Sequence, residues 1–160
     1  MTVVRSLAWL LLLPLSACAV SIGDRSGYER SDARDDSRRA IHEILDRQAA
    51  AWNRGDLDAF MADYWRSPDL VFTSGGRVQR GWRTTLDRYR DTYGGSTETM
   101  GRLSFHDVTV HPLSRDAAWA LGYWDLDRGG EEIGGVFTLV FRRIDGEWKI
   151  VHDHTSVSEE

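Results

Sequence analysis

The sequence has little cysteine, no excess of positive charge and no long apolar run. A single cysteine among 160 residues excludes a disulfide bond within the chain. The 20 basic and 25 acidic residues give a net charge of −5, which argues against nucleic acid as a partner, because phosphate binding needs a basic face. The apolar run over residues 7–15 is far shorter than the roughly 20 residues that span a bilayer. The length and the 41% hydrophobic content suit one globular domain.

The first 17 residues have the pattern of an export signal. Arg5 precedes the apolar run, as in the charged and apolar regions of a secretory signal peptide. The stretch that follows, Leu15-Ser16-Ala17-Cys18, resembles the lipobox of bacterial lipoproteins. The resemblance implies a signal peptide over 1–17, lipid attachment at Cys18 and a membrane anchor made of buried acyl chains. An ordinary signal peptide with a cysteine near its cleavage site is the alternative.

The residue after the cysteine bears on localisation. Position 19 is Ala19, whereas Asp at this place in lipoproteins tends to retain them in the inner membrane. The lipobox resemblance therefore implies a lipid-anchored protein of the cell envelope, on the periplasmic side of the outer membrane where the cell has one. Residues 18–37 have almost no apolar side chain after Ile22 except Tyr28, and they predict a flexible tether, because they cannot bury enough surface to offset their ordering entropy.

The rest of the chain predicts helices first and strands after. Apolar residues at helical spacing predict a helix over 41–52, a second helix after a cap at Asp56, and a third over 81–93. Alternating and apolar stretches predict strands at 70–73, 103–111, 117–126, 135–144 and 148–155. This order is typical of an α+β domain with an antiparallel sheet.

Five stretches carry a resemblance to a known family: AWNRGDLD at 51–58, GW at 81–82, DAAWALGYW at 116–124, GVFTLVFRR at 135–143 and DGEWKIVHDHTS at 145–156. With the order of elements, they resemble a SnoaL-like domain of the nuclear transport factor 2-like superfamily over 38–157. The resemblance implies a cone-shaped fold with N-terminal helices packed on a curved antiparallel sheet around an apolar pocket, and often a homodimer. It implies no single activity, because the family includes isomerases, cyclases, dehydratases and non-catalytic binders.

The last predicted strand holds two histidines. Strict alternation places His152 and His154 on the face of Trp148 and Ile150, and Asp153 on the opposite face. We therefore expect both histidines to point into the core or pocket, where an imidazole can act as a general base or a hydrogen-bond partner. The alternative is that both are core histidines whose ring nitrogens are hydrogen-bonded within the fold. Two histidines at i and i+2 are also a weak metal pattern that lacks a third ligand, so we predict no metal and no cofactor.

Aromatic side chains from several elements are the candidates for a pocket lining. An aromatic pocket suits a flat apolar ligand, although packing in the core or a dimer interface is the alternative. The candidates are Trp52, Tyr64, Trp82, Tyr89 and Trp124. Asp125 is a second candidate base, in addition to His152. Alternation, however, places it opposite the small residues that leave room for a cavity.

Three functions remain open at this point. The first is an envelope lipoprotein that binds a small, largely apolar molecule in an aromatic-lined pocket. The second is an isomerase or cyclase-type lyase that abstracts a proton from a small carbonyl compound with His152 or Asp125 as the base. The third is a homodimeric assembly module without catalysis.

Overall fold

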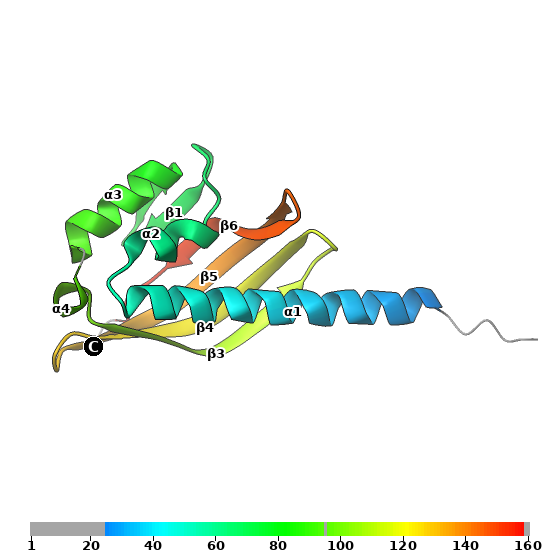
Figure 1. The fold of residues 1–160 in the computed structure, drawn as a ribbon, viewed down its shortest axis with the longest axis horizontal. Coiled ribbons are helices and arrows are strands. Elements are labelled where there is room, and N and C mark those ends of the chain that lie inside the picture. The colour runs from blue at the N-terminus through cyan, green and yellow to red at the C-terminus, as the bar shows by residue number, and fades with distance from the viewer. Residues whose placement is uncertain (1–24, 95, 159–160) are drawn as a thin grey trace, which may run out of the picture.

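The computed structural model describes residues 25–94 and 96–158, and it shows helices packed on one face of a single sheet (Figure 1). The helical elements that come first are α1 (Arg25–Trp52), α2 (Leu57–Phe60) and the 3-10 helix η1 (Met61–Asp63). The remaining elements are β1 (Val71–Ser74), β2 (Arg77–Arg80), α3 (Trp82–Tyr93), α4 (Thr97–Met100), β3 (Arg102–Pro112), β4 (Ala117–Asp127), β5 (Glu132–Ile144) and β6 (Glu147–Thr155). The predicted signal peptide, the lipobox and Cys18 lie outside the described residues.

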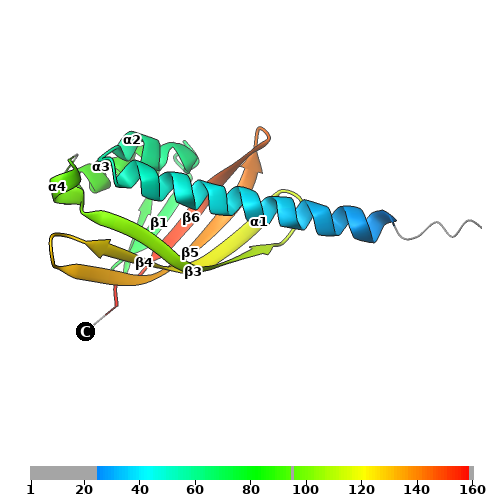
Figure 2. The same cartoon turned by 60° about the horizontal axis from the view of Figure 1, so that its bottom comes forward.

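The six strands form one sheet in the order β2-β1-β6-β5-β4-β3. All neighbours are antiparallel except β1 and β6, which run parallel. The sheet curves beneath α1, which crosses it (Figure 2). This arrangement confirms the predicted α+β fold with helices on a curved, mainly antiparallel sheet.

The core lies between α1 and the sheet. Ile41, Ile44, Leu45 and Trp52 are buried along one face of α1, as their helical spacing predicts. Gln48 lies on the same face, and its amide donates a hydrogen bond to the carbonyl of Phe60 at 3.1 Å. This hydrogen bond from the buried amide nitrogen ties α1 to α2.

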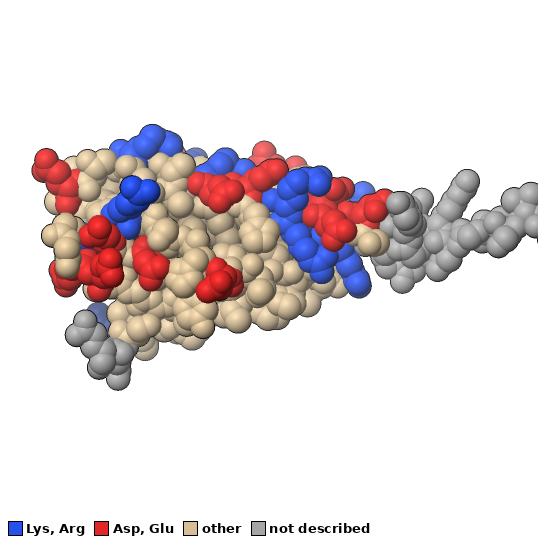
Figure 3. All heavy atoms as spheres, turned by 90° about the horizontal axis from the view of Figure 1, so that it is seen from below, with Lys and Arg blue, Asp and Glu red and all other residues tan. Residues whose placement is uncertain are grey.

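The helix α1 begins at Arg25, which differs from the predicted flexible tether, since residues 25–37 are helical. Ion pairs at i, i+3 spacing, Arg38–Asp35 and Arg39–Asp36, support a solvated helix by a few tenths of a kcal/mol each. Figure 3 shows charged side chains of both signs gathered toward this end of α1. A low apolar content excludes burial of the segment but does not exclude a helix. Within the described ranges, no helix combines the length and apolar character needed to cross a bilayer.

Candidate functional site

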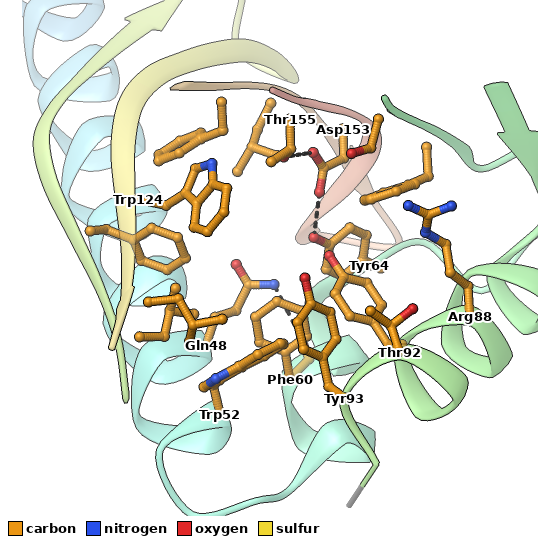
Figure 4. A pocket seen from close by; sticks show the side chains of 18 of the residues that line it. Gln48, Trp52, Phe60, Tyr64, Arg88, Thr92, Tyr93, Trp124, Asp153 and Thr155 are labelled. Atoms are coloured by element: carbon orange, nitrogen blue, oxygen red, sulfur yellow. Dashed lines mark hydrogen bonds between the residues drawn. The ribbon is translucent and has the colours of Figure 1, made fainter. Parts of the chain in front are cut away.

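A cavity of about 110 Å³ lies between the helices and the sheet (Figure 4). An apolar cavity of roughly 150 Å³ admits benzene, so this space suits a molecule with only a few non-hydrogen atoms. Nine aromatic side chains line it: Trp52, Phe60, Tyr64, Phe72, Tyr89, Tyr93, Phe105, Trp124 and Phe137. They come from helices on one side and from strands on the other, so the cavity depends on the whole fold.

One carboxyl group, that of Asp153, lines the cavity, and its side chain is 2% exposed. The Tyr64 hydroxyl donates a hydrogen bond to Asp153 Oδ2 at 2.7 Å, and the Thr155 hydroxyl donates one to Oδ1 at 2.7 Å (Figure 4). Burial raises the pKa of Asp153, and these two hydrogen bonds lower it in part. Burial also raises the pKa of Tyr64 well above its usual value, and the charge of Asp153 adds to that rise. Tyr64 is therefore held as a protonated donor.

The backbone brings Tyr64 and Asp153 together from distant parts of the chain. Tyr64 forms an isolated parallel bridge with Ile150, and the amide of Trp65 donates to the carbonyl of Ile150 at 2.9 Å. These contacts attach the end of η1 to β6 three residues before Asp153. The site is consequently built on strand pairing rather than on a loop.

The two tryptophan rings of the cavity wall are held by hydrogen bonds. Trp52 Nε1 donates to the carbonyl of Met100 at 3.2 Å, and Trp124 Nε1 donates to the carbonyl of Ser156 at 3.1 Å. Because the indole N–H groups are satisfied, the rings can present apolar faces to the cavity without a buried unpaired donor. The wall is therefore preorganised for an apolar ligand.

A β-bulge in β6 reverses the expected orientation of the histidines. Val140 of β5 pairs with His152, whereas the next residue of β5 pairs with Ile150, so Val151 is an extra residue in β6. After the bulge, Asp153 is buried and His154 is exposed. The structure contradicts the predicted inward orientation, since neither His152 nor His154 lines the cavity.

Two other predicted site residues also lie outside the cavity. Trp82 packs against the edge of the core, where its Nε1 donates to the carbonyl of Met61 at 2.9 Å. The Asp125 side chain is 56% exposed and pairs with His106 Nε2 at 3.0 Å. Asp125 therefore lies on the solvated face of β4, opposite the small residues, as alternation predicts.

The remaining candidates, Trp52, Tyr64, Tyr89 and Trp124, do line the cavity. Sequence reasoning missed Tyr93, although it lies on the same predicted helix face as Tyr89 and could have been found from that spacing. It also missed Asp153, for which local alternation gives the opposite face. A role in ligand binding stays a prediction for all of them.

The chemistry available at the site is that of a carboxyl group among aromatic rings. A desolvated carboxyl can accept a hydrogen bond from a bound molecule, compensate a positive charge, or exchange a proton. Among the described residues, no group of three histidine, cysteine or acidic side chains is placed to share a metal ion.

Comparison with known proteins gives the family. The sequence model of the SnoaL-like domain matches residues 41–159. An NTF-2-like protein of unknown function from Shewanella oneidensis is 42% identical, with 73% of this chain and 96% of that chain covered and a TM-score of 0.70. An NTF2-like superfamily protein from Salmonella enterica is 22% identical, with 81% and 94% covered and a TM-score of 0.64.

A third solved structure, a ketosteroid isomerase-like protein from Erwinia carotovora, shares the fold at 19% identity, with 76% and 95% covered and a TM-score of 0.61. The comparison with curated proteins gives no significant match. The length of the family match and the close fold agreement leave one assignment: the chain belongs to the SnoaL-like domain family of the NTF2-like superfamily.

Proposed function

We propose that this domain binds a small, largely apolar molecule in the aromatic cavity, with Asp153 and Tyr64 as its polar contacts. The observation that carries the proposal is a cavity walled by nine aromatic side chains with one buried carboxyl group. Protein interiors are normally close-packed, and both an empty space and a buried carboxyl reduce stability. A ligand that fills the space and contacts Asp153 offsets both costs.

The test is a thermal-shift series with small apolar probes, such as benzene, pyrrole and cyclopentanone, on the purified mature protein. We expect at least one probe to raise the melting temperature, because a ligand that binds only the folded state stabilises it. Trp124→Leu should weaken the shift. Trp119→Leu is the matched control, because Trp119 stacks on His111 and does not line the cavity. No shift with any probe, together with no retained small molecule in native mass spectrometry, would refute the proposal.

We also propose that the protein is an envelope lipoprotein anchored through Cys18. The support is the lipobox at Leu15-Ser16-Ala17-Cys18 behind a charged and apolar leader. Metabolic labelling with a palmitate analogue should mark the wild-type chain in the membrane fraction. Cys18→Ser should abolish the label, and a label that persists in this variant would refute the assignment.

A second candidate function is proton transfer on a carbonyl compound, and it is favoured by the burial that raises the pKa of Asp153. A desolvated carboxyl of this kind can act as a general base, so Asp153 replaces His152 and Asp125 as the candidate. A neighbour of the same fold is described as ketosteroid isomerase-like. Conversion of a small β,γ-unsaturated ketone to its conjugated isomer, lost in Asp153→Asn, would favour this function. Binding without conversion would favour the first.

A further inference from the structure

The charge balance of the cavity is unusual. Asp153 is the one charged side chain that is fully buried among the described residues. Its two hydrogen-bond donors, Tyr64 and Thr155, are neutral hydroxyls. Within residues 31–94 and 96–158, no lysine, arginine or histidine lies within ion-pair distance of its carboxylate. The ionised carboxylate is therefore hydrogen-bonded but has no cation to compensate its charge.

The aromatic walls of the cavity add to its negative potential. Aromatic rings carry negative potential on their faces, and a cation within about 6 Å of a ring centroid is attracted to it. The nine rings around Asp153 are held close to one another; for example, the Trp52 and Tyr93 centroids lie 4.8 Å apart and those of Phe60 and Tyr89 5.3 Å apart. An aromatic enclosure with one buried carboxylate is suited to a positive group with apolar substituents.

Arg88 is the one cation that lines the cavity, and it lies on the α3 side, away from the Trp124 wall (Figure 4). Its guanidinium is 5.5 Å from the Phe72 ring centroid. Its charge lowers the pKa of Tyr89 and Tyr93 in part. The charges that lower the pKa of Asp153 include those of His152 and His154, its neighbours along β6. Arg88 makes no ion pair with Asp153 within residues 31–94 and 96–158, so the carboxylate is available to a ligand.

We propose that the ligand of this cavity is a small organic cation, an amine or quaternary ammonium with apolar substituents, whose charge lies between the Asp153 carboxylate and the aromatic walls. This inference rests on the proposed function, since it names the chemical class of the molecule that the cavity binds. The volume of about 110 Å³ fits a cation with a few carbon substituents rather than a polycyclic one.

The test compares two probes of the same shape on the mature protein: choline, and 3,3-dimethylbutan-1-ol, in which a neutral carbon replaces the ammonium nitrogen. Dissociation constants are measured by NMR titration at pH 7.5. We expect choline to bind at least tenfold more tightly than the alcohol. Asp153→Asn should remove that preference, whereas Asp125→Asn on the solvated face should keep it.

A pH series on the unmodified protein supports the test in case Asp153→Asn does not fold. Choline does not titrate, so its advantage should decline as the pH falls and Asp153 takes up a proton. The titratable and hydroxyl groups that face or adjoin Asp153 are those of Tyr64, Tyr89 and Thr155, together with His152 and His154 on either side of it in β6. The affinity of the alcohol should change much less.

The outcomes separate the two proposals. Equal or tighter binding of the alcohol overturns the cation inference and leaves the proposed binding function in place. A choline preference that survives in Asp153→Asn overturns the role of Asp153. If neither probe binds, the cation inference is overturned, and the proposed function is overturned with it only if the apolar probes also give no shift.

Discussion

Tyr64→Phe is the sharpest test of how the site is held together. The substitution removes one hydroxyl from a buried side chain, and that hydroxyl donates to Asp153 Oδ2 at 2.7 Å. A hydrogen bond to a charged group contributes about 1.5–3 kcal/mol, because the alternative is a buried charge with an unsatisfied oxygen. We expect the free energy of unfolding, at a pH where Asp153 is ionised, to fall by about that amount, as measured by urea denaturation followed by circular dichroism and fluorescence.

The same substitution should raise the pKa of Asp153 further, since the hydrogen bond from Tyr64 stabilises the ionised form. The destabilisation should therefore shrink as the pH falls and Asp153 becomes neutral. Carbon-detected NMR of the labelled carboxyl group measures this directly. Tyr123→Phe is the matched control, because Tyr123 is 47% exposed and lies on the solvated face of β4. The control should change stability by less than about 0.5 kcal/mol. Equal effects of the two substitutions, with no change at Asp153, would refute the reasoning.

Two further predictions concern stability. Burial raises the pKa of Asp153 in the folded chain, so its contribution to stability is fully present below the unfolded pKa and is lost as the pH rises through the folded pKa. The free energy of unfolding of the wild type, relative to that of Asp153→Asn, should therefore decrease as the pH rises through that window. Urea denaturation at several pH values measures this difference. A difference that stays constant or increases with pH would contradict the prediction. Gly135→Ala should lower the free energy of unfolding by more than about 3 kcal/mol or prevent folding, because a Cβ there overlaps the carbonyl oxygen of Ser156. Near-wild-type stability of this variant would contradict the close approach of β5 to the segment that follows β6.

The parts of the fold that sequence could predict are those with a strong local period. The buried face of α1, including Ile41, Ile44 and Trp52, follows helical spacing because one stripe of the helix meets the sheet. The cap at Asp56 is also local, since its side chain accepts a hydrogen bond from the amide of Ala59 at 2.9 Å. Such features depend on a few neighbouring residues, and tertiary contacts do not override them.

The elements that were not predicted from the sequence lack a regular spacing of apolar residues. The strand β2, Arg77–Arg80, is polar and mostly exposed, so no burial pattern marks it. It forms by pairing with β1 across a turn at Gly75 and Gly76, both of which have positive φ. The parallel pairing of β1 with β6 is equally invisible in sequence, because it joins segments about 80 residues apart.

The chemical character of the cavity depends on one such non-local feature. A regular β6 would turn the imidazoles of His152 and His154 inward and leave Asp153 in solvent. The extra residue Val151 instead lets Ile150 and Asp153 share the buried face, three positions apart. The register that fixes this comes from the partner strands, through Phe72 opposite Asp153 in β1 and Val140 opposite His152 in β5. Because alternation within one strand carries no record of its partners, the sequence alone indicates a basic imidazole where the folded chain presents a carboxylate.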